Sequence, residues 1–311
     1  MTQAALNQAT HQDRPMLGIL LMIGFCAIAP LGDATAKILG DTIPLIQLLA
    51  VRFAIQAVIL LPLIFAAGIS LRMSPYVLRM TFLRTALHII GIGAMFTSLR
   101  YLPLADAVAI AFVMPFIMLV LGATILGEEV GPRRIAACAV GFVGTLLVVQ
   151  PSFAEVGWPA FLPIVVAFTF AFYMLVSRQI AKECDPLALQ TISGFIGTPV
   201  LVLLLVLTWG RTDSIFGIVT PNATETWLLL GIGVLGTCGH LLMTWSLRFA
   251  PSATVAPVQY LEIPCATFIG WLIFSDLPNG LAAIGIAITM AAGLYILYRE
   301  RSLAQPRPSE A

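Results

Sequence analysis

The chain has 311 residues, of which 59% are hydrophobic and only 10% carry a charge. Soluble domains carry roughly 25% charged residues, so this composition excludes an ordinary soluble protein. The net charge of +1 also argues against a nucleic-acid-binding surface, which would need an excess of basic residues. The apolar residues come in separate runs of about 20 residues, the length that a helix needs to cross a membrane.

Ten such runs follow one another, and we expect each to be a transmembrane helix. The connections between them are short and contain turn-forming residues, which leaves no room for a soluble domain. The fold class is therefore an all-α integral membrane protein. The predicted spans are Leu17–Leu39, Pro44–Ala67, Tyr76–Leu99, Leu104–Leu126, Pro132–Val149, Trp158–Arg178, Leu187–Trp209, Thr226–Phe249, Ser252–Phe274 and Asn279–Tyr298.

Both ends of the chain are polar. Residues 1–15 are expected to form an N-terminal tail and residues 299–311 a disordered C-terminal tail. No convincing small-residue cleavage site follows the first apolar run, so we interpret that run as a retained helix rather than a signal peptide.

The positions of Lys and Arg predict the orientation, because cytoplasmic loops are enriched in these residues. With the N-terminus inside, twelve of the 16 fall on the inner side and three, Lys37, Arg100 and Arg211, on the outer side, while Arg52 lies within a span. Both termini are therefore expected in the cytoplasm, and the protein in a plasma membrane, most simply a bacterial inner membrane.

A short stretch of the first half returns in the second half. Ser98-Leu99-Arg100-Tyr101-Leu102-Pro103 is followed 148 residues later by Ser246-Leu247-Arg248-Phe249-Ala250-Pro251. Such self-similarity indicates an internal repeat. Two repeats of five spans each must enter the membrane in opposite orientations, an arrangement that places a binding site near the midplane and permits alternating access. Arg100 is expected to connect the corner between the third and fourth helices, and Arg248 the corner between the eighth and ninth. Both are expected to influence gating.

Charged residues at membrane depth each need a reason, because insertion costs roughly 2.5–3.5 kcal/mol. Asp33 and Lys37 lie one turn apart in the first helix. Two interpretations are open: a neutralised pair at the outer boundary with Lys37 reaching the interface, or an Asp33 that lines the transport pathway. Arg52 in the second helix is interpreted as a structural ion-pair partner, of Asp33 or of Asp106.

Histidines and aromatic residues form a second group of candidates. His88 in the third helix and His240 in the eighth could titrate near neutral pH, although a lone histidine in a bundle usually serves as an interhelical hydrogen-bonding group. Phe96 and Trp245 could stack on a substrate that contains a ring.

The ninth helix holds the most deeply placed acid. Pro257 and Pro264 loosen this helix and free backbone carbonyls, and Gln259, Tyr260 and Glu262 lie between them. Glu262 is the first candidate for contacting a substrate cation or carrying a coupling proton, although a structural partner such as Arg248 is an open alternative.

The matching part of the fourth helix has Pro115 but carries Met114 where the ninth helix has its acid. The site is therefore expected to be asymmetric. The five cysteines form no CxxC pair, and we expect no metal and no cofactor. The chain contains no P-loop, GxSxG or HExxH motif, which argues against ATP drive and against an enzyme.

Several motifs resemble those of the drug/metabolite transporter superfamily, in its ten-helix branch with two EamA-type domains. They are Asp33–Lys37, Arg52-Phe53, Leu99–Ala107, Pro115, Leu126–Glu128 and Gly141–Gly144. The resemblance implies one domain over residues 16–150, a second over 157–298, and a central cavity between them. The ninth helix looks most like that of S-adenosylmethionine uptake carriers, while riboflavin carriers and amino-acid exporters share the architecture.

These observations together predict a secondary active carrier for a small organic metabolite, cofactor-like or amino-acid-like. Its partners would be the substrate, the lipid bilayer, a coupling proton or exchanged solute, and a second copy of the chain if it forms a homodimer. The alternatives are an exporter of amino acids or toxic metabolites and, in a different class, an intramembrane enzyme.

Overall fold

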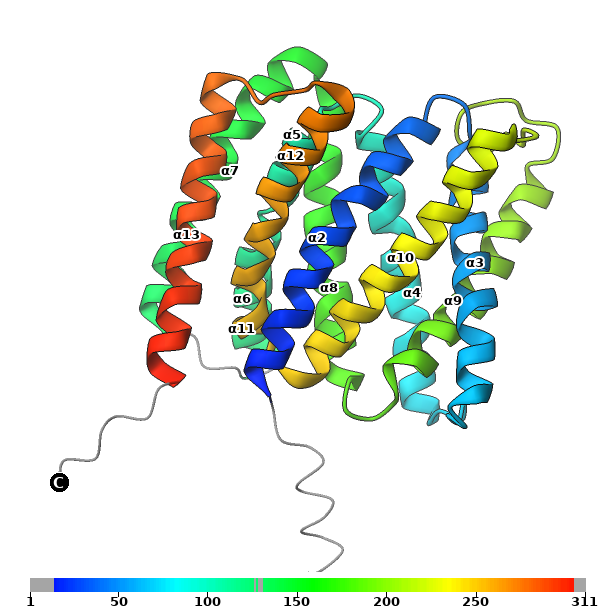
Figure 1. Cartoon of the computed structure of the whole chain (residues 1–311), viewed down its shortest axis with the longest axis horizontal. Helices are drawn as coiled ribbons and strands as arrows, with labels where there is room; N and C mark the ends of the chain where they lie inside the picture. The colour runs from blue at the N-terminus through cyan, green and yellow to red at the C-terminus, as the bar shows by residue number, and fades with distance from the viewer. Residues whose placement is uncertain (1–13, 126, 128–130, 305–311) are drawn as a thin grey trace, which may run out of the picture.

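A computed structural model describes residues 14–125, 127 and 131–304. Within these residues the chain is all-helical (Figure 1). The elements are α2 Pro15–Leu39, α3 Leu45–Ala66, α4 Pro75–Ser98, α5 Leu104–Ala111, α6 Met114–Ile125, α7 Pro132–Val156, η1 Trp158–Phe161, α8 Leu162–Ile180, α9 Pro186–Leu207, α10 Ala223–Phe249, α11 Ser252–Val255, η2 Ala256–Leu261, α12 Glu262–Phe274 and α13 Gly280–Ala304. Most of both predicted tails lies outside the described residues.

Local sequence explains where several helices begin. The Ser74 hydroxyl accepts a hydrogen bond from the Val77 amide at the start of α4, and a side-chain oxygen of Asp185 accepts one from the Leu187 amide at the start of α9. Each cap is followed directly by a proline, which fits the first helical turn because its missing N–H has no partner there. Asn222 begins α10 with a reciprocal capping box.

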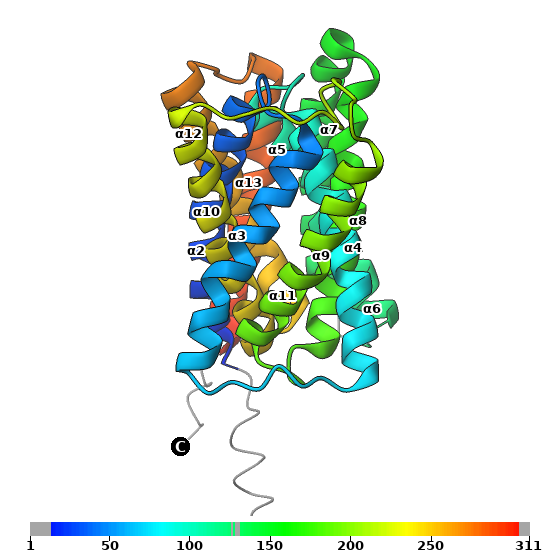
Figure 2. The same ribbon diagram turned by 90° about the vertical axis from the view of Figure 1, so that its right-hand side faces the viewer.

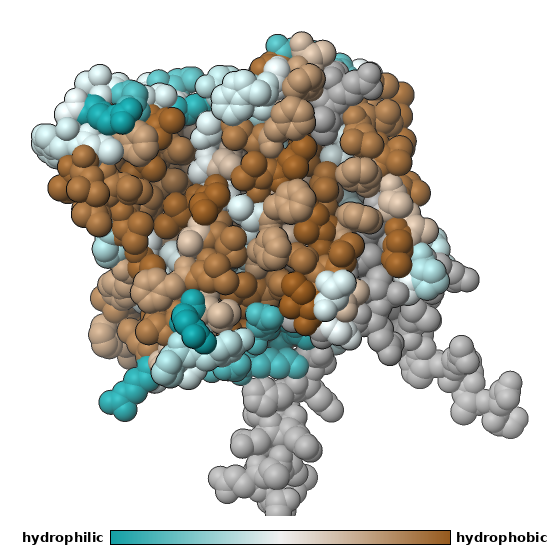
Figure 3. Space-filling view, turned by 180° about the vertical axis from the view of Figure 1, so that it is seen from behind, coloured by the Kyte–Doolittle hydropathy of each residue, from teal (hydrophilic) through white to brown (hydrophobic). Residues whose placement is uncertain are grey.

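Eight helices in the described part are long and apolar enough to cross a membrane, and Val258–Phe274 and Gly280–Ala292 are shorter apolar helices. On the face shown in Figure 3, hydrophobic residues form a broad band, and hydrophilic residues gather above and below it. Large apolar side chains such as Phe65, Leu207 and Trp227 are exposed. Exposure of such residues over a wide surface is what lipid contact requires. The chain is therefore a multi-pass membrane protein.

The two halves repeat one another in space. The offset of 148 residues carries α4 onto α10 and α7 onto α13, and corresponding helices run in opposite directions (Figure 1). The most extensive contacts join the halves: α2 packs on α10, α4 on α8, α3 on α9 and α7 on α13 (Figure 2). Since α8 corresponds to α2, the first two pairs exchange under the repeat. This is the packing that a twofold axis in the membrane plane generates.

The two spans predicted as Leu104–Leu126 and Ser252–Phe274 are interrupted, which corrects the expectation of continuous helices. The first stops at Ala111 and resumes at Met114, with short i to i−3 hydrogen bonds at Phe112 and Val113. The second contains the 3-10 turn η2 and resumes at Glu262. The prolines at 115, 257 and 264 lack the amide that a continuous helix would use. The interruptions coincide under the repeat, although only the second was expected.

We name the end of the bundle where α2 begins and α13 ends the terminal end, and the other the far end. Arg100 lies at the far end and donates to the carbonyl oxygens of Ile43 and Ser214 at 3.3 and 3.1 Å. Arg248 lies at the terminal end and pairs with Asp185 at 3.4 Å. Each arginine therefore contacts the loop between the first two helices of its own repeat.

Candidate functional site

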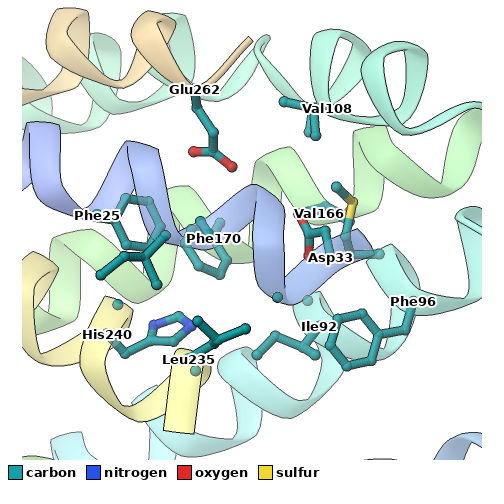
Figure 4. A pocket seen from close by; sticks show the side chains of 18 of the residues that line it. Phe25, Asp33, Ile92, Phe96, Val108, Val166, Phe170, Leu235, His240 and Glu262 are labelled. Atoms are coloured by element: carbon teal, nitrogen blue, oxygen red, sulfur yellow. The ribbon is translucent and has the colours of Figure 1, made fainter. Parts of the chain in front are cut away.

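A cavity of about 100 Å³ lies between the two halves, in the middle of the bundle. Its walls come from α2, α3, α4, α8 and α10 and from the interrupted helices α5, α6 and α12. Most of its lining is apolar and aromatic (Figure 4). The aromatic and ionisable residues of the lining are Phe25, Asp33, Arg52, Phe96, Phe112, Phe170, His240 and Glu262.

Corresponding positions of the two repeats meet in this cavity. Met114 is the first residue of α6 and Glu262 the first residue of α12, and both line the cavity. Ile92 and His240 are a second such pair. In both pairs the second repeat supplies the polar member. The cavity is therefore symmetric in its backbone and asymmetric in its chemistry.

Glu262 extends from the start of α12 into the cavity (Figure 4). Its side chain is 9% exposed. Among the described residues it makes no ion pair, and Arg248, the alternative partner, pairs with Asp185 instead. A buried carboxyl group without a protein partner is uncommon, because buried polar groups are normally hydrogen-bonded.

Asp33 lines the same cavity from α2. It does not form the expected pair with Lys37, whose ammonium group donates to the Leu102 carbonyl at 2.7 Å and lies 3.7 Å from a carboxylate oxygen of Asp276. Lys37 thus connects α2 to two far-end loops. The second interpretation of Asp33, as a cavity residue, agrees with its place.

Arg52 also lines the cavity, although it is only 3% exposed. The expected ion pair is not formed: in the described part of the chain neither Asp33 nor Asp106 lies within 4.0 Å of its guanidinium. Asp106 instead accepts a hydrogen bond from Ser152 at 3.1 Å.

The two histidines meet across the interface between α4 and α10. Their Nε2 atoms lie 3.1 Å apart, so one ring donates and the other accepts. His240 lines the cavity, whereas His88 is fully buried behind it, where its ring packs on Phe53 and Tyr173. Each histidine therefore has a hydrogen-bonding partner on another helix. Hydrogen bonding between helices is the usual role of a histidine in a bundle.

A polar network continues from the histidines toward the terminal end. Arg84 of α4 is completely buried. Its guanidinium donates to hydroxyl groups on α8, α9 and α10, those of Tyr173, Ser177, Ser193 and Thr244. Gln190 extends the network to the His240 carbonyl at 3.0 Å. Neither the network nor the cavity aromatics Phe25 and Phe170 were singled out from the sequence.

Other predicted site residues lie outside the cavity lining. Tyr260 is buried and packs on Phe112, with ring centroids 5.5 Å apart. The Gln259 amide contacts the Met174 sulfur at 3.3 Å, and Trp245 lies half-buried on α10. Phe96 does line the cavity. Pro264 borders a shallow surface groove, and the side chains of Pro115 and Pro257 lie outside the described part.

Metal binding has no support in the described residues, which contain no group of three or more His, Cys, Asp or Glu side chains placed to hold an ion. The polar groups that face the cavity are two carboxylates, one guanidinium and one imidazole. Such a set can bind an organic molecule through charge-assisted hydrogen bonds, while the aromatic walls can hold a ring.

Comparison with known proteins connects this geometry to a family. A riboflavin transporter of Rhizobium johnstonii is 30% identical over 217 residues, covering 70% of this chain and 69% of the relative. An S-adenosylmethionine uptake transporter of Rickettsia prowazekii is 24% identical, covering 91% and 93%. A pseudopaline exporter of Pseudomonas aeruginosa is 26% identical, covering 90% and 93%.

A solved crystal structure has the same fold, with a TM-score of 0.68 at 17% identity, covering 94% of this chain and 98% of the other. The model of the EamA-like transporter family matches residues 16–150 and again residues 157–299. These two matches together span most of the described bundle. The boundary between them lies near the end of α7, where the first repeat ends. The chain belongs to the EamA-like transporter family.

Proposed function

We propose that this protein is a secondary active carrier that moves a small organic metabolite through the central cavity by alternating access. The observation that carries the proposal is a pair of acids, the buried Glu262 and the half-buried Asp33, which face an aromatic cavity between two inverted halves. Neither acid pairs with a described residue. A substrate with a flat ring and a cationic or hydrogen-bond-donating group would satisfy both the aromatic walls and the acids.

The relatives support a metabolite of this kind. Riboflavin and S-adenosylmethionine, the molecules in the names of two groups of relatives, both contain a fused heterocycle. The four phenylalanines of the cavity suit such a ring. Import and export both occur among the relatives' names, so an exporter with the same site is the alternative within the family.

The proposed topology has ten spans with both termini in the cytoplasm, as the distribution of Lys and Arg favours. The far end of the bundle is then extracellular. There, Lys37 with Asp276 and Arg100 with the Ser214 carbonyl join one half to the other. At the terminal end the Ser246 hydroxyl donates to the Gly18 carbonyl at 2.7 Å. Opening one set of contacts while the other holds would expose the cavity to one side at a time.

The polar network of Arg84 lies on the cytoplasmic side of the cavity in this topology. Release toward the cytoplasm would separate α4 from α10 and break the contact between His88 and His240. Energy for transport would come from a coupling proton or an exchanged solute rather than from ATP. Glu262 is the proposed coupling or substrate-binding group.

Transport by purified protein in liposomes tests the proposal. Wild-type protein should accumulate radiolabelled S-adenosylmethionine, riboflavin or an amino acid in an energised and saturable manner. Glu262→Gln should lower the initial rate at least tenfold with unchanged insertion, because it removes the charge from the cavity. Glu155→Gln, an exposed acid outside the cavity, is the matched control. Normal transport by Glu262→Gln would remove this residue from the mechanism, and chemical conversion without movement would favour an enzyme.

A further inference from the structure

Two arginines are buried among the residues that the structure describes, and their surroundings differ completely. We infer that Arg52 binds a carboxylate of the substrate, and that the transported molecule is therefore an amino-carboxylate metabolite that also contains a ring. This inference rests on the proposed function and narrows its substrate class. Arg84 provides the internal comparison, because it shows how this chain satisfies a guanidinium that has only a structural role.

Arg84 is held on three of its nitrogens. Its Nε donates to Ser177 at 2.7 Å and its Nη1 to Ser193 at 2.8 Å, while Nη2 contacts Tyr173 and Thr244. The ring of Tyr173 also lies 4.4 Å from the guanidinium carbon. Neutral oxygens and a ring face surround this cation, so it needs no ligand.

Arg52 has no comparable partners. Its guanidinium has five N–H donors, yet in the described part of the chain none of them makes a hydrogen bond, and the buried Nη1 atom is without any partner. The contact it does make is with the ring of Phe53, 5.7 Å from the guanidinium carbon. Leaving such a donor unsatisfied in the protein interior is unfavourable, and more so when the group is charged. A ligand that supplies a hydrogen-bond acceptor would explain why the unsatisfied guanidinium of Arg52 lines the cavity.

The opposing helix is built to leave this guanidinium in place. A Cβ atom on Gly236 would lie 2.5 Å from Arg52 Nε and 2.7 Å from Nη2. Gly236 itself lines the cavity. A larger residue at this position would push the guanidinium out of its present place. The position of Arg52 on α3 therefore depends on a glycine at position 236 of α10.

The charges of the cavity indicate what kind of molecule fits. Two acids, Glu262 and Asp33, and one fixed cation, Arg52, face the same space. A substrate with a carboxylate for the guanidinium and a cationic group for one acid would pair two of these three charges, and a second cationic group of the substrate, or a proton, would neutralise the other acid. Planar guanidinium groups bind carboxylates through two parallel hydrogen bonds, which also fixes the orientation. A neutral ring compound would offer Arg52 only uncharged acceptors, which form weaker hydrogen bonds with a guanidinium than a carboxylate does.

Asp33 offers a different explanation of Arg52. The two share the cavity, and Arg52 could balance the charge of Asp33 at a distance without touching the substrate. In that case removing both charges together would restore binding. If Arg52 binds a carboxylate, the double variant still lacks its acceptor site, and its preference among ligands stays altered.

Binding to purified protein in nanodiscs tests the inference with ligand pairs that differ only by a carboxylate. The pairs are S-adenosylmethionine with its decarboxylated analogue and tryptophan with tryptamine, and riboflavin is the neutral probe. Wild-type protein should prefer the carboxylate member of at least one pair roughly tenfold or more, as a charge-assisted hydrogen bond implies. Arg52→Gln should remove that preference, and Arg52→Lys should keep part of it.

Controls separate this role from a structural one. Arg79→Gln changes an exposed arginine of α4 and should keep the preference. If Arg52→Gln does not give monodisperse protein, Gly236→Ala displaces the guanidinium while keeping its charge, and should lower the preference as well. Recovery of the wild-type preference in Arg52→Gln with Asp33→Asn would overturn the inference in favour of charge balance.

The outcomes also distinguish the inference from the proposed function. Equal binding within both pairs, or tight binding and transport of riboflavin that Arg52→Gln leaves unchanged, would refute carboxylate recognition and leave the carrier intact. Absence of binding and transport for every probe would refute both.

Discussion

Replacing Arg84 by methionine tests how the bundle tolerates a buried charge. Methionine is also unbranched and flexible, but it is shorter and has neither charge nor donors. The substitution removes four hydrogen bonds to hydroxyl groups on α8, α9 and α10. It also removes the cost of holding a cation inside the membrane. These two effects have opposite signs, and their sizes decide the result.

Hydrogen bonds between helices in membranes average about 0.6 kcal/mol each, so the four bonds contribute about 2–3 kcal/mol. An arginine at the centre of a spanning helix costs roughly 2.5–3.5 kcal/mol on insertion scales. The freed hydroxyls can bond to their own helices, as Thr244 already does to the His240 carbonyl at 2.7 Å. We therefore expect Arg84→Met to change the free energy of unfolding by less than about 1 kcal/mol. Arg84→Lys keeps the charge with fewer donors and should be the less stable variant.

The assay is reversible unfolding in mixed micelles of increasing SDS content, followed by tryptophan fluorescence. The order of stability should be wild type close to Arg84→Met, with Arg84→Lys clearly lower. A loss of several kcal/mol in Arg84→Met, with Arg84→Lys close to wild type, would refute the reasoning. It would mean that the shape and charge of the network stabilise the bundle more than the buried cation costs.

Two further changes probe the contacts between the halves. A Cβ atom on Gly144 would collide with the Thr289 hydroxyl of α13, so Gly144→Leu should lower the melting temperature in detergent by several degrees. Gly231→Leu is the control and should not lower it, because nothing lies within 4 Å of a Cβ atom there. Equal effects of the two substitutions would contradict close packing of α7 on α13. Lys37→Met removes the half-exposed ion pair with Asp276. The substitution should change the free energy of unfolding by less than about 1 kcal/mol but should alter the initial rate of transport. An unaltered rate would argue against a gate at this end of the bundle.

Much of the architecture could be predicted because it depends on local properties. Runs of apolar residues and the turn formers between them identify helices and their approximate ends, since a spanning helix needs only length and hydrophobicity. All ten predicted starts lie within three residues of the start of a described helix. Some ends differ more, since α7 continues to Val156 and α13 to Ala304. The acid that begins α12 was also visible, because Glu262 stands alone in an apolar segment between prolines.

The partners of the charged residues could not be predicted in this way. Arg52 and Arg84 look alike in the sequence, because each is a cation inside a predicted spanning helix. The structure surrounds Arg84 with hydroxyl groups 89 to 160 residues away along the chain and leaves Arg52 facing the cavity without them. Whether a buried arginine finds hydroxyl partners depends on how the faces of α3, α4, α8 and α10 pack against one another.

The sequence by itself determined a repeated, multi-span membrane protein with acids at the depth of a binding site. Only the tertiary structure decided which of the charges in the described residues have protein partners and which face the cavity without one. The physical reason is that hydrophobicity acts on each helix separately, whereas a hydrogen bond requires two groups within about 3 Å. His88 and His240 illustrate the difference: both were identified as candidates in their own helices, and their contact exists only because α4 packs against α10.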